Sequence, residues 1–421
     1  MVRSTAISLL ISGLASASAV SAAPRYEIQV DERDPLLVKV SLQNPAAILR
    51  LRQSQDQGSL HKSPACGGRA LVRASPGSWR VPAGCKRVEW STRISVVDGS
   101  SAFDIAAPAP VWDPKARLWL LTSALPWLRG DGQKSASVSI SARLRGKTLV
   151  RSVVLPEDAS IPLAFVVGRP VRSFVADGFT IEGYGHLPAP ETDAWQRQLA
   201  AIIAAWRRDL LPSDSSFPPQ MSYVWLPPPA NADPGLSASA NTGSVLMQYA
   251  PAPDEPVAGP RLKGGILVIG AHEGFHALGA VRGAPEWAGE GLATYFAYRG
   301  AKPNLDVQSH QLVREMINAP ADLSLLNLQK AFKAGDGSAY PLFYGKGARF
   351  WAAIEQVLTV RPNGSGNLAA LIRETKGFEG IAWSDGDQIA RYFDRYSQGR
   401  ARAIVQCFVI EDNCRIADQP I

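Results

Sequence analysis

The chain has 421 residues, of which 46% are hydrophobic and 19% are charged, and its formal net charge is +7. This composition is that of a globular protein, which excludes a disordered or fibrous chain, and the length is enough for two domains with separate cores. The Lys and Arg residues are scattered and form no basic run interleaved with aromatic residues, so the sequence predicts no nucleic-acid partner.

The N-terminus has the pattern of a cleavable secretory signal. Arg3 precedes an apolar stretch from Ala6 to Val20, and small residues follow up to Ala23. We therefore expect residues 1–22 to be a signal peptide and the mature protein to be secreted, most simply into a periplasm. Later stretches fall short of the roughly 18 uninterrupted apolar residues that a membrane-spanning helix needs, so no membrane span is expected. The pattern gives no prediction of the oligomeric state.

Four cysteines are consistent with that compartment. Cys66 and Cys85 lie in one loop-rich region, and Cys407 and Cys414 lie near the C-terminus. Two local disulfides are the simplest of the three possible pairings, and an oxidising space would keep both closed. The alternative is a cysteine zinc site, which neither spacing favours.

The first part of the chain has the alternating pattern of β-strands. Val88–Val96 and Ala136–Leu144 alternate apolar with polar residues, as expected for strands with one buried face. Weaker strand candidates are Tyr26–Val30, Leu36–Leu42, Leu118–Thr122 and Ala164–Val167. We expect residues 23–180 to form an antiparallel β-sandwich domain. We interpret four tryptophans as packing residues between the sheets, although a carbohydrate platform is the alternative: Trp79, Trp112, Trp119 and Trp127.

The periodicity changes after Asp177–Ala189, a stretch that we interpret as a connector. Trp195–Leu210 has helical spacing and ends before Pro212. Met221–Trp225 and Ser244–Tyr249 have the character of short strands. Helical patterns then predominate, at Ile266–Leu278, Glu290–Arg299, Gln308–Ile317, Phe343–Leu358, Leu368–Thr375 and Gln388–Tyr396. The predicted fold class is therefore α+β, with a mostly helical domain over residues 181–421.

One predicted helix carries the sequence His272-Glu273-Gly274-Phe275-His276. The two histidines are spaced i and i+4, so both imidazoles lie on the same face with Glu273 beside them. A zinc ion held by two imidazoles needs a third protein ligand and an open position. Glu290, near the start of the next helix, is the candidate for that ligand. Burial of such groups without a partner would cost several kcal/mol, which favours metal binding.

These two segments resemble the gluzincin metallopeptidases, and the glycyl aminopeptidase-like and peptidase MA-like groups in particular. His272, His276 and Glu290 fall on the zinc-ligand positions of that clan, and Glu273 falls on the general base. Trp287, Gly291 and Ala293 match the residues that pack around the third ligand. The resemblance implies a thermolysin-like catalytic domain, one Zn²⁺ per chain, and peptide or protein substrates.

A third segment, Phe343–Ala348, is similar to the Tyr-x-Lys-Gly segment of aminopeptidase-like members of the clan. The resemblance implies that Tyr344 stabilises the oxyanion, and the alternative is a tyrosine that only packs at an apolar helix. We interpret Lys346 as structural. Thr294, one turn after Glu290, either hydrogen-bonds a ligating histidine or faces solvent.

In gluzincins an edge strand before the metal helix pairs with extended substrate, and Gly243–Gln248 occupies that place here. Gly243–Tyr249 has no glutamate to bind a free α-amino group, and Gln248 is the nearest polar side chain. Aminopeptidase and endopeptidase action therefore both stay open. The leading hypothesis is a secreted zinc-dependent peptidase. The alternative is a non-catalytic periplasmic binding or envelope-assembly protein that retains the fold.

Overall fold

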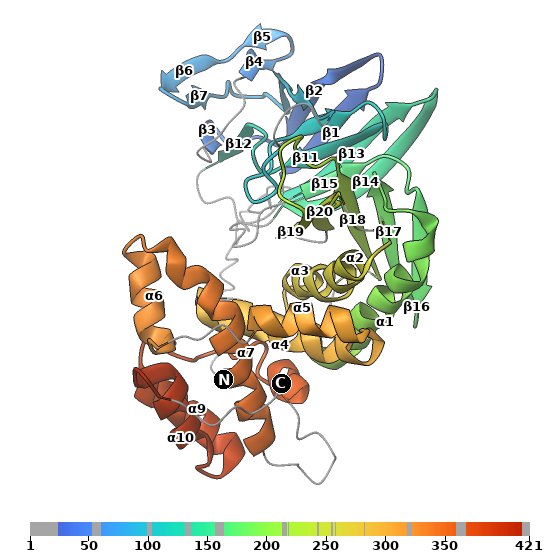
Figure 1. Ribbon diagram of the computed structural model, residues 1–421. Coiled ribbons are helices and arrows are strands. Elements are labelled where there is room, and N and C mark those ends of the chain that lie inside the picture. The colour runs from blue at the N-terminus through green and yellow to red at the C-terminus, as the bar shows by residue number, and fades with distance from the viewer. Residues whose placement is uncertain are drawn as a thin grey trace, which may run out of the picture.

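The computed structural model describes residues 24–52, 60–98, 103–130, 136–155, 164–212, 217, 219–241, 244–253, 256, 258–281, 283–317, 322–358 and 368–414. The expected signal peptide, residues 1–22, lies outside these described residues. A β-rich N-terminal part packs against a helical C-terminal part (Figure 1). This arrangement confirms the predicted α+β order.

The largest sheet of the β-rich part has seven strands. In spatial order they are β14 (Lys147–Leu155), β13 (Ala136–Leu144), β1 (Arg25–Asp31), β2 (Asp34–Gln43), β8 (Arg87–Arg93), β4 (Leu60–Cys66) and β5 (Arg69–Ala70). Neighbouring strands are antiparallel except β1 and β13, which run parallel. Alternate residues such as Tyr26, Ile28 and Val30 are buried, which is why the alternating pattern predicted these strands.

Two four-stranded sheets complete this part. One has the order β12 (Trp127–Gly130), β3 (Ile48–Arg52), β7 (Ser78–Arg80) and β6 (Val72–Ser75). The other has the order β15 (Ala164–Val167), β11 (Leu118–Thr122), β10 (Val111–Asp113) and β9 (Ser95–Val96). Their shared core buries Trp79, Trp112, Trp119 and Trp127, so the packing interpretation of the tryptophans is confirmed.

The disulfides Cys66–Cys85 and Cys407–Cys414 are both formed, as predicted. The first fastens the end of β4 to the turn before β8, and the second joins the π-helical turn at Gln406–Ile410 to the residues that follow it. No free cysteine occurs in the part of the chain that the structure describes.

A fourth sheet lies between the β-rich part and the helices. Its order is β16 (Arg172–Ala176), β17 (Phe179–Gly185), β18 (Gln220–Leu226), β20 (Ser244–Ala250) and β19 (Gly235–Asn241). The interpretation of Asp177–Ala189 as a connector is wrong, because β17 occupies most of it. The predicted domain boundary at residues 180 and 181 falls within β17, and the place where the domains separate stays a prediction.

The two faces of this sheet belong to different cores. Tyr223 and Trp225 of β18 point towards the helices, whereas Val224 and Leu226 of the same strand pack on the sheet that contains β11. All four side chains are buried. One sheet therefore supports both halves of the molecule.

The edge strand of this sheet is β19, and the expectation that Gly243–Gln248 forms the edge is wrong. Ser244–Gln248 belongs to β20, which pairs with β18 on one side and with β19 on the other. Within β19 the sequence Gly-Leu-Ser-Ala-Ser-Ala-Asn consists mostly of small residues with weak β propensity. The sequence analysis therefore did not predict this strand.

Ten α-helices lie in the described part of the chain. They are α1 (Asp193–Leu210), α2 (Pro260–Gly264), α3 (Gly270–Leu278), α4 (Glu286–Ala301), α5 (Val307–Ile317), α6 (Leu325–Lys333), α7 (Tyr340–Val357), α8 (Leu368–Glu374), α9 (Gly386–Ser397) and α10 (Ala401–Val405). All the predicted helices are present, whereas α2, α6 and α10 were not predicted. None of the described helices has the length and apolarity that a bilayer crossing requires.

Candidate metal centre

The two histidines are presented by a helix with an irregular start. A π-helical turn at Gly265–Ile269 joins α2 to α3, and π turns of this kind are frequent beside functional sites. His272 and His276 follow one turn apart on α3. The helix ends at Gly279, whose φ of 63° is the left-handed conformation typical of a helix C-terminus.

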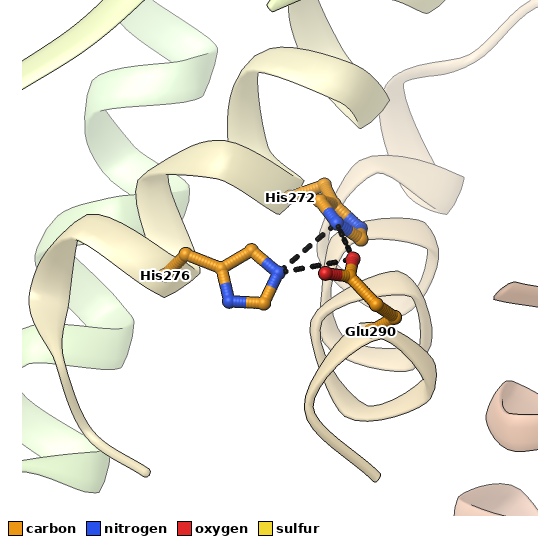
Figure 2. Close-up of side chains that lie close together, drawn as sticks. All are labelled: His272, His276 and Glu290. Carbon is orange, nitrogen blue, oxygen red and sulfur yellow. Dashed lines mark hydrogen bonds and ion pairs between the residues drawn. The ribbon is translucent and has the colours of Figure 1, made fainter. Parts of the chain in front are cut away.

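Glu290 of α4 meets both imidazoles. Its Oε2 atom lies 2.9 Å from His272 Nε2 and 3.3 Å from His276 Nε2, and the two Nε2 atoms are 3.2 Å apart (Figure 2). Ligands bonded to zinc at 2.0–2.1 Å in a tetrahedron lie roughly 3.3 Å from one another. The three atoms therefore have the spacing of one face of a zinc tetrahedron, and the fourth corner is left for water or substrate.

Thr294 fixes which nitrogen of His272 faces this centre. Its hydroxyl donates to the backbone oxygen of Glu290 at 2.8 Å, so towards His272 Nδ1, at 3.2 Å, it can only accept. The Nδ1 atom therefore carries the proton, and in the neutral ring Nε2 presents its lone pair to the centre. Thr294 is buried, which excludes the solvent-facing alternative and confirms the hydrogen bond to a ligating histidine.

The members of the triad shift one another's pKa values. Burial raises the pKa of Glu290, but the two imidazoles outweigh it and hold the pKa of this carboxyl well below its usual range. Burial lowers the pKa of His276, whereas Glu290 and Glu273 raise it above its ordinary value overall. Among the described residues these three ligands form the one group of this kind, and their two nitrogens and one oxygen suit zinc.

Glu273 lies beside the centre on α3. Burial is the main reason that its pKa is raised, opposed by His272 and His276 and reinforced by Glu290. The backbone N–H of Ala240 on the edge strand β19 donates to its carboxylate. The strand and the helix are thus joined at the residue that the sequence analysis assigned as the general base.

Gln248 does not lie where the sequence analysis expected it. Its side chain is buried and donates to the backbone oxygens of Phe103 at 3.3 Å and Pro227 at 3.1 Å. Both bonds face the β-rich part of the molecule. Gln248 is therefore a structural residue between the two halves and is no part of the centre.

Helix α7 brings two tyrosines to the triad. The ring of Tyr344 lies 5.4 Å from that of His272, centroid to centroid, in an edge-to-face arrangement. Burial and the charge of Glu290 raise the pKa of Tyr344, which keeps its hydroxyl protonated. Lys346 instead points away and donates to the backbone oxygen of Leu323 at 2.5 Å, in agreement with its structural interpretation.

The sequence analysis missed Tyr340, one turn before Tyr344. Its hydroxyl donates to Glu290 Oε1 at 3.0 Å. The i, i+4 spacing of the two tyrosines places them on one helix face and is the signal that could have identified Tyr340. The site thus combines α3, α4, α7 and the edge of the sheet.

Comparison with known proteins gives a likeness at the level of fold. No protein-family model matches the sequence, and no curated protein matches it. Among solved structures the chain is similar to an aminopeptidase N family protein from Idiomarina loihiensis, with 14% identity and a TM-score of 0.62 over 92% of this chain and 76% of that chain. The two proteins share a fold. The fold that the motifs led us to expect is therefore confirmed.

Two further solved structures are similar over most of this chain. One is the M1 zinc metallopeptidase from Deinococcus radiodurans, with 13% identity and a TM-score of 0.48 over 95% of this chain and 96% of that chain. The other is yeast LTA4 hydrolase, with 10% identity and a TM-score of 0.46 over 94% of this chain and 68% of that chain.

Proposed function

We propose that the protein is a zinc-dependent peptidase that hydrolyses peptide bonds in peptides or proteins. The observation that carries this proposal is the convergence of His272, His276 and Glu290 at zinc-ligand spacing, with the carboxylate of Glu273 beside them. Zinc bound there would polarise the scissile carbonyl and lower the pKa of water towards ~7.

The protein side chains then supply the proton transfers. Glu273 takes the proton from the attacking water and delivers it to the leaving amine, since burial raises its pKa and so makes the carboxylate a stronger base. The Ala240 N–H holds its carboxylate in place. Tyr344, which is protonated and lies next to His272, donates to the oxyanion that develops on the substrate carbonyl.

The edge strand β19 is the surface on which an extended substrate would pair. Its backbone has one neighbour, β20, and it contacts Glu273 through Ala240. Residues 235–241 include no Asp or Glu, so this strand offers no carboxylate to a free α-ammonium group. Desolvation of an ammonium ion that gains no such partner is unfavourable in free energy. We therefore propose cleavage inside peptide chains, without recognition of the N-terminus.

The site of action that we propose is outside the cytoplasm, in a periplasm reached through the signal sequence at residues 1–22.

 Two disulfides join residues that are close in sequence, and such bonds persist in oxidising compartments. An extracytoplasmic location therefore fits the covalent structure of the folded chain.

The test is a peptide library offered to the zinc-loaded protein, with each peptide present in free and N-acetylated form. We expect cleavage at internal bonds at similar rates for both forms, and no cleavage by Glu290→Ala, whose zinc content should fall in elemental analysis. Saturable binding without cleavage would favour the non-catalytic binding or envelope-assembly protein. Cleavage restricted to free N-termini would show an aminopeptidase instead.

A further inference from the structure

The two carboxylate oxygens of Glu290 have different partners. Oε2 faces His272 Nε2 and His276 Nε2, at 2.9 Å and 3.3 Å. Oε1 accepts the hydroxyl proton of Tyr340 at 3.0 Å, a bond that joins α4 to α7 across 50 residues of sequence. Oε2 therefore faces the two imidazoles, whereas Oε1 is engaged by α7.

The ring of Tyr340 is fixed beside that carboxylate by packing against other aromatic rings. It packs against Phe332 and Phe343, with centroid distances of 5.4 Å and 5.9 Å. Tyr344 lies edge-to-face with it at 5.5 Å, and the Tyr344 hydroxyl donates to the Tyr340 hydroxyl. The result is a hydrogen-bond chain from Tyr344 through Tyr340 to Glu290.

The hydrogen bond to Oε1 affects how many coordination positions Glu290 would take at the metal. A carboxylate that binds through both oxygens takes two coordination positions, and a catalytic zinc site with three protein ligands keeps its remaining position for water. A hydrogen bond to Oε1 favours binding through Oε2 alone, because it occupies one lone pair of Oε1 and orients the carboxylate so that Oε2 faces the two imidazoles.

We propose that Tyr340 is a positioning residue that restricts Glu290 to a single metal-binding oxygen. The proposal rests on the zinc site of the proposed function. The two tyrosines of α7 then have different roles, since Tyr340 orients a ligand whereas Tyr344 is the proposed donor to the substrate oxyanion. Without substrate the Tyr344 hydroxyl donates to Tyr340, and stabilisation of an oxyanion would require this proton to turn to the substrate oxygen.

The test compares Tyr340→Phe with Tyr344→Phe, because each change removes one hydroxyl and keeps the ring that packs. Zinc affinity is measured by competition with a chelator, and the coordination of the metal is followed by the visible absorption spectrum of the cobalt(II)-substituted protein. We expect Tyr340→Phe to bind zinc about 10- to 100-fold more weakly and to change the cobalt spectrum. Tyr344→Phe should leave both measurements close to those of the wild type.

The same zinc affinity and the same cobalt spectrum in Tyr340→Phe and wild type would overturn the role of Tyr340. An equal change in both variants would also overturn it, since the effect would then belong to the helix face as a whole. Both measurements report metal binding and need no turnover. A wild type that binds metal without cleaving peptides would contradict the proposed peptidase and still decide the role of Tyr340.

Discussion

A Cβ atom placed on Gly291 would lie 2.5 Å from the Cα atom of Gly347, so α4 and α7 cross with their backbones nearly in contact. A Cβ atom on Gly347 would likewise lie 2.7 Å from the backbone oxygen of Trp287. This close crossing carries Tyr340 and Tyr344 to the ligand on the neighbouring helix. It also explains the glycine at position 347, next to Lys346.

Replacement of Gly291 by alanine should therefore disturb both the fold and the site. The added methyl group would clash with backbone atoms, which cannot relieve the clash by changing rotamer. We therefore expect the free energy of unfolding to fall by about 1–3 kcal/mol and zinc binding to weaken. Denaturant unfolding and chelator competition measure the two effects. Gly289→Ala on the same helix is the matched control, because its nearest contact would be His276 Cε1 at 4.0 Å. Equal stability of the two variants would contradict the close crossing.

Replacement of Glu273 by glutamine should separate metal binding from chemistry. The amide cannot accept the proton of the attacking water, and we expect kcat to fall by about 10²- to 10⁴-fold. The ligands His272, His276 and Glu290 are untouched, so elemental analysis should find the zinc content of the wild type. Unchanged turnover with full zinc would remove Glu273 from the mechanism.

Replacement of Thr294 by valine should weaken zinc binding with almost no change in side-chain volume. The change removes the acceptor of His272 Nδ1–H and leaves that buried donor without its partner. We expect a loss of zinc affinity of about 10- to 100-fold. Thr294→Ser retains a hydroxyl and should restore most of it. The same loss in both variants would show that the methyl group, rather than the hydroxyl, is important.

Asp412 gives the helical part a pH-dependent contact. Its carboxylate accepts from the backbone N–H of Ser324 at 2.6 Å and from the side chain of Asn327 at 3.0 Å, and these bonds lower its pKa below 3.8. Since the folded-state pKa is lowered, the stabilisation is present above the unfolded-state pKa and is lost as the pH falls through the folded-state pKa.

The wild type should accordingly melt at a higher temperature than Asp412→Asn at pH 7, and the difference should shrink below about pH 4. Thermal unfolding monitored by circular dichroism across this range provides the measurement. Asn327→Ala, which removes a donor and keeps the carboxylate, should reduce the same pH dependence. A difference that stays constant from pH 7 to pH 3 would exclude titration of Asp412 as its cause.

The metal ligands could be predicted because their chemistry depends on local spacing. His272 and His276 share a face as soon as their segment is helical. Glu290 was recognised because it lies near the start of the next helix. Most of the helices in the described part of the chain, and fewer than half of its strands, were predicted for a similar reason, since burial of one face leaves a period of 3.6 or two in the sequence.

The contacts that the sequence did not reveal depend on how distant elements pack. The bond from Tyr340 to Glu290 exists because two helices cross at Gly291 and Gly347, and no local pattern encodes that crossing. The edge position of β19 depends on the order of strands in the sheet, which cannot be derived from a run of small residues.

The sheet with a core on each face makes the helical half dependent on the half that precedes it. A fragment that began at β16 would present Val224, Leu226 and Leu246 to water, and each such side chain loses about 1.5–3 kcal/mol of stabilisation when it is exposed. The fragment would also lose the bond of 2.7 Å between His186 and Asp113. The helical half therefore depends on packing against the N-terminal half for part of its stability.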